Sequence, residues 1–151
     1  MRITDALLGE HGAFYAQFDR LEEELPNAAA AAEVREQAAL LAAALVTHAK
    51  LEDELLFDRM AAAGGNAGLL ETMTDEHEQI ADRLGRAQGT NDVALARTEL
   101  LEAVALARDH FAKEERLAFP LAATLLGDTI LSEIGSQWAD RRTVWLDPDG
   151  R

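Results

Sequence analysis

Cysteine is absent from this chain of 151 residues, and proline occurs only three times. The lack of cysteine excludes disulfide bonds, thiol catalysis, iron–sulfur clusters and cysteine-ligated zinc sites. No run of 18 consecutive apolar residues is present either, so we expect no membrane-spanning helix. The opening residues, which reach the acidic Asp5 at once, lack the pattern of a secretory signal, and we therefore expect a cytoplasmic protein.

Basic residues are also scarce, because 14 Lys and Arg stand against 28 Asp and Glu, for a formal net charge of −14. This acidic balance argues against nucleic acid or an anionic membrane as the main partner. An apolar fraction of 48% with 28% charged residues is typical of a globular protein. The length suits one domain. We place it at residues 1–142, followed by a tail at 143–151 without periodicity.

Few prolines and abundant Ala, Leu and Glu favour helix nearly everywhere. Thr4 is the expected N-cap of the first helix, Pro26 should end it, and Pro120 should bend the fourth helix. The pattern predicts an all-α fold, an antiparallel up-down-up-down four-helix bundle with a short C-terminal helix. The predicted helices cover residues 5–25, then from 27 or the alanine run 28–32 to 64–65, then 67–88, 92–126 and 129–142.

All four histidines fall on apolar stripes that should face the core, one on each main helix: His11, His48, His77 and His110. Glutamates follow two of them by four residues, Glu52 after His48 and Glu114 after His110. Four residues is about one helical turn, so each pair projects from one face, which on the fourth helix continues to Leu117. Imidazole and carboxylate are ligand types for iron, manganese or zinc.

The chain also resembles two helix hairpins of one design. A shift of 62 positions aligns His48 with His110 and Glu52 with Glu114, and a shift of 66 positions aligns Glu10-His11 with Glu76-His77. Two such hairpins packed face to face would bring four histidines and two glutamates to a common centre. A buried carboxylate without a partner is costly, on the order of several kcal/mol, and two divalent cations would offset that cost.

This set of residues resembles the hemerythrin-like (HHE cation-binding) domain over about residues 5–126, most clearly in the segments HAKLEDELLF and HFAKEERLAFP. The resemblance implies an antiparallel four-helix bundle around a non-haem di-iron centre. It implies His48 and His110 as terminal ligands, and His11 and His77 as the ligands of the other two helices. Glu52 and Glu114 would be the bridging carboxylates.

Two departures from oxygen-carrying hemerythrins bear on function. Those proteins have a second histidine one turn before the third-helix histidine, where this chain has Met73. They also place an Asp five residues after the last histidine, whereas Glu114 lies four after His110. The remaining pattern is similar to mycobacterial hemerythrin-like proteins and iron-sensing hemerythrin-like domains. With six protein ligands, two of them bridging, each iron keeps more than one open position.

The resemblance therefore implies redox chemistry rather than stable oxygen carriage. We expect two iron ions, with manganese or zinc as alternatives, and catalase- or peroxidase-like reaction with hydrogen peroxide or dioxygen. Three other interpretations are a sensor of iron or oxygen without turnover, reversible binding of O2 or NO, and a metal-free bundle. The oligomeric state is open.

Several nearby side chains have two interpretations. Tyr15, the single tyrosine, is a candidate ligand, a hydrogen-bond donor to bound peroxide, a radical quencher or a core residue. Met73 suits core filling better than ligation. Glu10 and Glu76 are candidates for orienting a metal-bound imidazole. Trp138 and Trp145 would cover a bundle end or form an oligomer contact.

Overall fold

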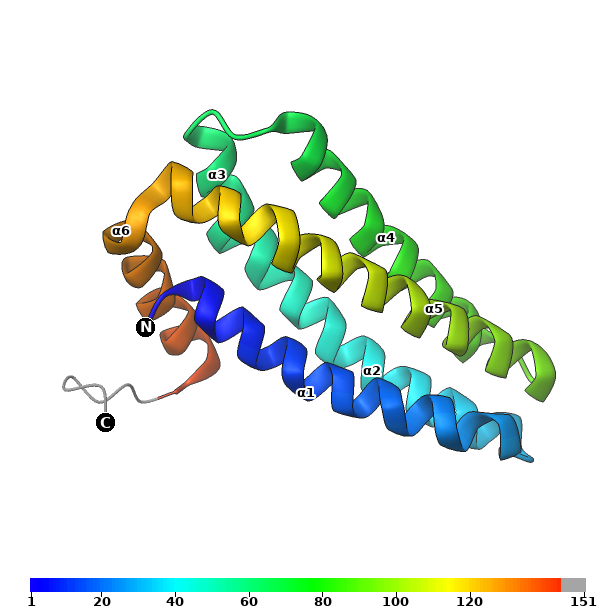
Figure 1. The fold of residues 1–151 in the computed structure, drawn as a ribbon. Helices are drawn as coiled ribbons and strands as arrows, with labels where there is room; N and C mark the ends of the chain where they lie inside the picture. The colour runs from blue at the N-terminus through cyan, green and yellow to red at the C-terminus, as the bar shows by residue number, and fades with distance from the viewer. Residues whose placement is uncertain (145–151) are drawn as a thin grey trace.

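A computed structural model describes residues 1–144 of the chain. Its elements are α1 (Ile3–Glu24), η1 (Leu25–Asn27), α2 (Ala31–Leu51), η2 (Glu52–Phe57), α3 (Asp58–Ala62), α4 (Ala67–Gly89), α5 (Val93–Lys113), η3 (Glu114–Ala118) and α6 (Phe119–Arg142). Here η1 is a short 3-10 turn, whereas η2 and η3 are π-helical. The π-turns continue the helices on either side of them. Four long rods result, and they run antiparallel (Figure 1).

The predicted all-α four-helix bundle is therefore confirmed, and residues 1–144 contain no β-strand. The helix starts differ in detail from the expectations. Thr4 lies buried inside α1, and the N-cap is Arg2, whose backbone N–H donates to Asp5 Oδ2 at 3.3 Å. The second helix begins at Ala31, within the alanine run that was one of its two predicted starts. Pro120 lies in the first turn of α6, directly after the π-turn η3.

A bend at Gly127 replaces the predicted gap between the fourth and fifth helices. Its φ of 72° and ψ of 166° are accessible to glycine and break the helical path within α6. The segment after the bend packs beside the start of α1 (Figure 1). Gly135 permits this approach, because a Cβ there would overlap the carbonyl oxygen of Met1.

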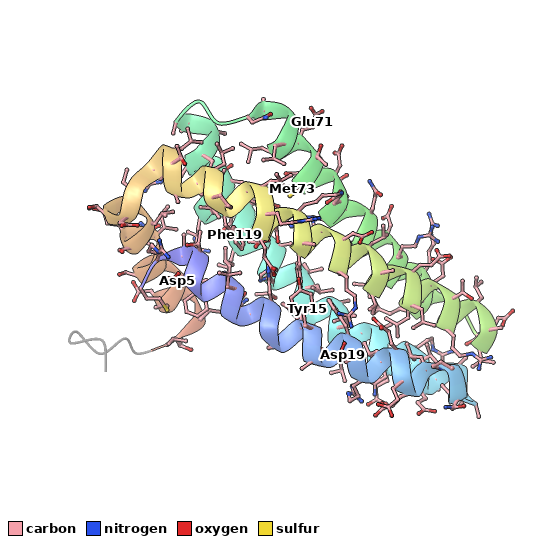
Figure 2. The ribbon with its side chains drawn as sticks, viewed as in Figure 1. Asp5, Tyr15, Asp19, Glu71, Met73 and Phe119 are labelled. Atoms are coloured by element: carbon pink, nitrogen blue, oxygen red, sulfur yellow. The ribbon has the colours of Figure 1, made fainter. Side chains whose placement is uncertain are left out.

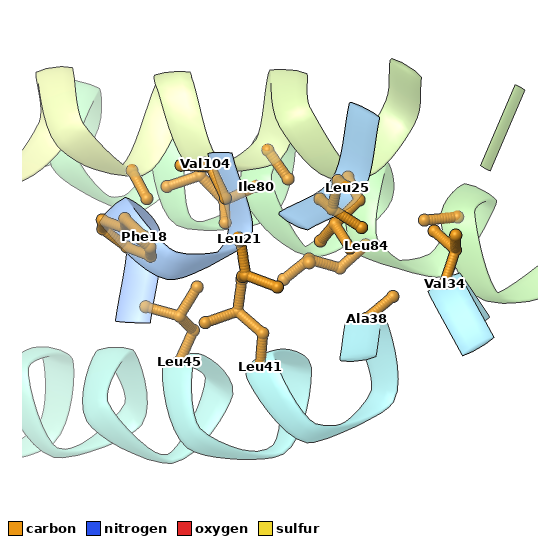
Figure 3. Packing of buried hydrophobic residues seen from close by; sticks show 14 of the residues in the cluster. Phe18, Leu21, Leu25, Val34, Ala38, Leu41, Leu45, Ile80, Leu84 and Val104 are labelled. Atoms are coloured by element: carbon orange, nitrogen blue, oxygen red, sulfur yellow. The ribbon is translucent and has the colours of Figure 1, made fainter. Parts of the chain in front are cut away.

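Two apolar clusters occupy the bundle, one on each side of a polar layer. One cluster contains residues of α1, α2, α4 and α5, and in α1 and η1 it extends from Phe14 to Leu25. Figure 3 shows its interleaved side chains. The other joins the start of α1, the π-turns and α6, and it includes Trp138, which is 9% exposed and covers that end of the bundle. Trp145 and most of the predicted tail lie outside the described residues. Along the chain His11, His48, His77 and Glu114 each lie between a residue of one cluster and a residue of the other.

The helical stretch Val93–Arg142 is long and apolar enough to cross a membrane by length and composition alone, a test that core helices of soluble proteins also pass. In this fold the stretch carries the buried polar residues His110 and Glu114 in its middle. The expectation of no membrane partner remains a prediction.

Candidate metal centre

Six side chains from four helical rods form two groups of potential metal donors. One group contains His11, His48, Glu52 and Glu114, and the other contains His77, His110 and the same two glutamates. Within each group the donor atoms all lie within 4.8 Å of one another. The structure thus brings together all six residues that the sequence singled out.

Each glutamate presents one oxygen to each group. Glu52 Oε1 lies 3.2 Å from His48 Nε2, whereas its Oε2 lies 3.4 Å from His77 Nε2. Glu114 behaves the same way, with Oε1 3.0 Å from His110 Nε2 and Oε2 3.2 Å from His11 Nε2. This is the arrangement expected of two carboxylates that bridge a pair of ions. Each ion would then have two imidazole nitrogens and two carboxylate oxygens.

The donor atoms are buried and unpartnered. The Nε2 atoms of all four histidines, and both carboxylate oxygens of Glu52 and Glu114, have no hydrogen-bond partner among the described residues. Leaving one buried polar atom unpaired costs about 1–3 kcal/mol, and more for a charged one. Two divalent cations would satisfy all eight atoms at once, so the donor set fits a dinuclear metal site.

The pKa shifts of the donor residues also indicate a site that attracts positive charge. Burial lowers the pKa of His11, but Glu114 and Glu52 outweigh this effect and raise that pKa to about 9. Burial also lowers the pKa of His48, and Glu52 and Glu10 raise it to about 10. Burial raises the pKa of Glu52, yet the nearby imidazoles hold it well below its usual range. The carboxylates therefore attract positive charge, which protons or metal ions can supply.

A second layer of carboxylates faces the Nδ1 atoms of the histidines. Each Nδ1–H can donate to its carboxylate, which orients the ring and leaves Nε2 free to bind a metal. The Nδ1-to-oxygen distances are 2.5 Å for His48–Glu10, 2.8 Å for His110–Glu76, 2.9 Å for His11–Glu115 and 3.3 Å for His77–Asp53.

These four contacts close a ring around the bundle. Each carboxylate is the chain neighbour of a donor on its own helix and orients a histidine on another helix. The contacts therefore run from the α1 rod to α2, from α2 to α4, from α4 to α5, and from α5 back to α1. Sequence reasoning singled out Glu10 and Glu76 for this role, and it took Asp53 and Glu115 as groups that are either solvated or lie behind the ligands. The same shift of 62 positions that aligns the bridging glutamates also aligns Asp53 with Glu115, and this was the available signal.

Three of the four orienting carboxylates, Glu10, Glu76 and Glu115, also contact a further side chain that holds them in place. Glu10 accepts from Arg142 Nε at 2.8 Å and from Trp138 Nε1 at 3.2 Å. Lys113 pairs with Glu76. Asp53 differs, because its Oδ1 is buried with no hydrogen-bond partner among the described residues.

Tyr15 lies on α1 (Figure 2) and belongs to neither donor group. Its hydroxyl donates to Glu115 Oε1 at 3.0 Å, the same oxygen that lies 2.9 Å from His11 Nδ1. Burial and the adjacent Glu115 raise the pKa of Tyr15 to about 12, so the phenol keeps its proton. Tyr15 therefore supports the carboxylate that orients His11. Met73 is fully buried in an apolar cluster and belongs to neither donor group.

The two π-turns position both sides of the centre. Each begins at a bridging glutamate, Glu52 or Glu114. A π-turn adds a residue to the helical turn and rotates the face that follows it, and such turns are frequent at functional sites. Leu117, predicted to face inward, is consequently 53% exposed. Phe119 is buried instead, with its ring 5.6 Å from that of His11 (Figure 2).

The model of one protein family, described as the hemerythrin HHE cation binding domain, matches residues 2–122. Searches of curated proteins and of solved structures return no significant match. The matched span contains all six donors and all four orienting carboxylates. The predicted resemblance is thereby confirmed, and with it a helical module whose His and Glu clusters suit a bound metal. The chain belongs to the hemerythrin HHE cation-binding domain family.

Proposed function

We propose that this protein is a non-haem di-iron protein that reacts with hydrogen peroxide or dioxygen in catalase- or peroxidase-like redox chemistry. The observation that carries the proposal is the pair of four-donor groups that share Glu52 and Glu114. Iron commonly takes six ligands, so four protein donors leave room for a small oxygen species at each ion. Histidine and carboxylate donors without thiolate also suit manganese and zinc. Zinc has no redox change, whereas iron and manganese both have one that serves this chemistry.

Two bound iron ions would supply paired one-electron oxidation and reduction. The protein's own residues hold the donors and tune them. Glu52 and Glu114 fix the spacing of the two positions and carry two negative charges into the apolar interior. The Nδ1 contacts set the tautomer of each imidazole. The phenol of Tyr15 keeps its proton and donates it in a hydrogen bond to Glu115. The flanking apolar clusters exclude bulk water, which strengthens these interactions.

The test uses tag-free protein loaded with iron. Hydrogen peroxide is expected to change its visible spectrum and to be consumed at a rate that depends on the bound iron. Glu52→Ala should abolish both effects, because both ions lose a donor, whereas Glu23→Ala, an exposed glutamate far from the centre, should leave them unchanged. Iron-loaded protein that neither changes its spectrum nor consumes peroxide contradicts the proposal.

A second candidate is a sensor in which metal occupancy controls folding. It is favoured by the eight buried donor atoms that lack partners, because such a site couples metal binding to stability. A large gain in thermal stability on iron loading, with no peroxide consumption, would select the sensor. A cytoplasmic location and the absence of nucleic-acid or membrane partners remain predictions from sequence.

A further inference from the structure

A cavity of about 390 Å³ lies between α2 and α4 and reaches the metal centre. His48, His77 and His110 line it, whereas His11 does not. The side chain of His77 is 10% exposed, against 1% for each of the other three histidines. The path from the surface therefore leads to the His77 side of the centre.

The opposite side of the bundle, between α1 and α5, is filled by aromatic rings. Phe111 stacks on the ring of His11, with centroids 3.8 Å apart and planes 9° apart, and its other side forms part of the cavity lining. Phe14, Tyr15 and Phe18 contribute rings 5.6–5.9 Å from Phe111. The guanidinium of Arg108 lies over this cluster, 5.4 Å from the Phe18 ring.

The internal repeat explains why only one side is open. The shifts of 62 and 66 positions give each residue of the aromatic cluster, and Arg108 above it, a small or aliphatic counterpart. Every counterpart lines the cavity. The decisive substitution is Ala49 at the counterpart of Phe111, the ring that covers the other half of the centre. The full correspondence is Ala49 for Phe111, Val46 for Arg108, Ile80 for Phe14, Ala81 for Tyr15 and Leu84 for Phe18.

The size and lining of this space do not match hydrogen peroxide or dioxygen. A water molecule occupies about 30 Å³ in the liquid, and an apolar cavity of about 150 Å³ holds benzene. A space of about 390 Å³ is larger than both. Its inner wall includes Leu45, Ile80 and Leu84, all buried and apolar, whereas Lys50 and Glu54 lie at the exposed rim. Pockets with apolar walls and a few polar groups at one end are typical sites for small organic molecules.

We propose that the α2–α4 cavity binds the apolar tail of an organic hydroperoxide and directs its peroxide group toward His77. This inference rests on the proposed function and narrows its substrate class. In the reaction the O–O bond of the hydroperoxide breaks, and its two oxygens leave as an alcohol and a water. Two protons would come from solvent, and two reduced iron ions held by the six donors would supply one electron each.

The variant Ala49→Phe tests the proposal, because it places a ring where Phe111 lies in the other half. Ala43→Phe is the matched control, since it makes the same change on an exposed position of α2 that does not line the cavity. Ala81→Tyr narrows the cavity from α4 and serves as the second variant if Ala49→Phe does not fold. The probe is 2-phenylpropan-2-ol, the alcohol of cumene hydroperoxide, and its binding to the metal-loaded protein is measured by calorimetry.

The probe is expected to bind the wild-type protein and Ala43→Phe with equal affinity, and Ala49→Phe at least tenfold more weakly. Cumene hydroperoxide should oxidise the reduced, iron-loaded wild-type protein and Ala43→Phe at the same rate, and Ala49→Phe at least tenfold more slowly. Equal binding by Ala49→Phe and the wild type, or no binding by the wild type, overturns the proposal. Probe binding with no response to either peroxide would instead overturn the proposed function and leave the apolar site in place.

Discussion

The α1–α5 side and the α2–α4 side of this bundle carry equivalent metal donors in different surroundings. His11 lies under the Phe111 ring, and Tyr15 braces the carboxylate that orients it. His77 lies beside a cavity, and its orienting Asp53 has an unpartnered oxygen. The difference shows that the two sides preserve the donors of the centre, while neighbouring residues such as Phe111 and its counterpart Ala49 set packing and access. The following changes would break or sharpen this comparison, in order of expected effect.

Removing a bridging carboxylate should affect both halves equally. Glu52→Ala and Glu114→Ala each take a donor from both groups, so each should lower the metal content by more than half. His77→Ala removes a donor from one group only and should spare the ion on the His11 side. Elemental analysis of tag-free protein checks this. Retention of one full equivalent of metal by either glutamate variant would show that the carboxylates do not bridge.

Removing the ring at position 111 and adding one at position 49 should change the free energy of unfolding in opposite directions. Phe111→Ala removes a buried ring, so the free energy of unfolding should fall by about 3–5 kcal/mol. Ala49→Phe fills open space and should raise it by about 0.5–2 kcal/mol. Urea denaturation of the metal-loaded proteins measures both. A similar loss in the two variants would mean that the α2–α4 cavity is not available to a side chain.

The orienting carboxylates should differ in importance. Loss of a carboxylate that orients a metal-bound histidine typically lowers metal affinity about 10–100-fold. Glu10→Ala should fall near the upper end, because Glu10 lies 2.5 Å from His48 and is held by Arg142 and Trp138. Asp53→Ala should fall near the lower end, because its contact with His77 is 3.3 Å. Competition with a metal chelator gives both affinities, and the reverse order would contradict the ranking.

Tyr15→Phe should have the smallest effect. The loss of one hydrogen bond to Glu115 should cost about 0.5–1.5 kcal/mol. Because the folded-state pKa of Tyr15 is raised to about 12 from an ordinary 10, its contribution is complete below pH 10 and is lost as pH rises from 10 to 12. As Tyr15 is the single tyrosine, phenolate absorbance reports it alone. A titration midpoint near 10 in the folded protein would show that Glu115 does not hold this proton.

The helices and the six donors could be predicted from sequence because both depend on local spacing. A histidine and a glutamate four residues apart share a helix face in any straight helix. The π-turns could not be predicted this way, since no glycine or proline lies within Glu52–Phe57 or Glu114–Ala118. Leu117 was consequently assigned to the wrong face.

The surroundings of the centre depended on contacts between helices. The roles of Glu115 and Asp53 require knowing which histidine on another helix each one meets. The cavity required the spacing of α2 and α4 as well as the small side chain of Ala49. The repeat made the pairing of Ala49 with Phe111 visible in sequence, but not the volume that the exchange leaves.

The ring of imidazole–carboxylate contacts has a consequence for how the bundle assembles. Every rod gives one carboxylate to a neighbour and receives one on its own histidine. A slide of any rod by one turn, about 5.4 Å, would separate two of these pairs at once and break at least one of the two donor groups. The polar layer thus favours one axial register of the four helices. Apolar packing alone would tolerate several registers.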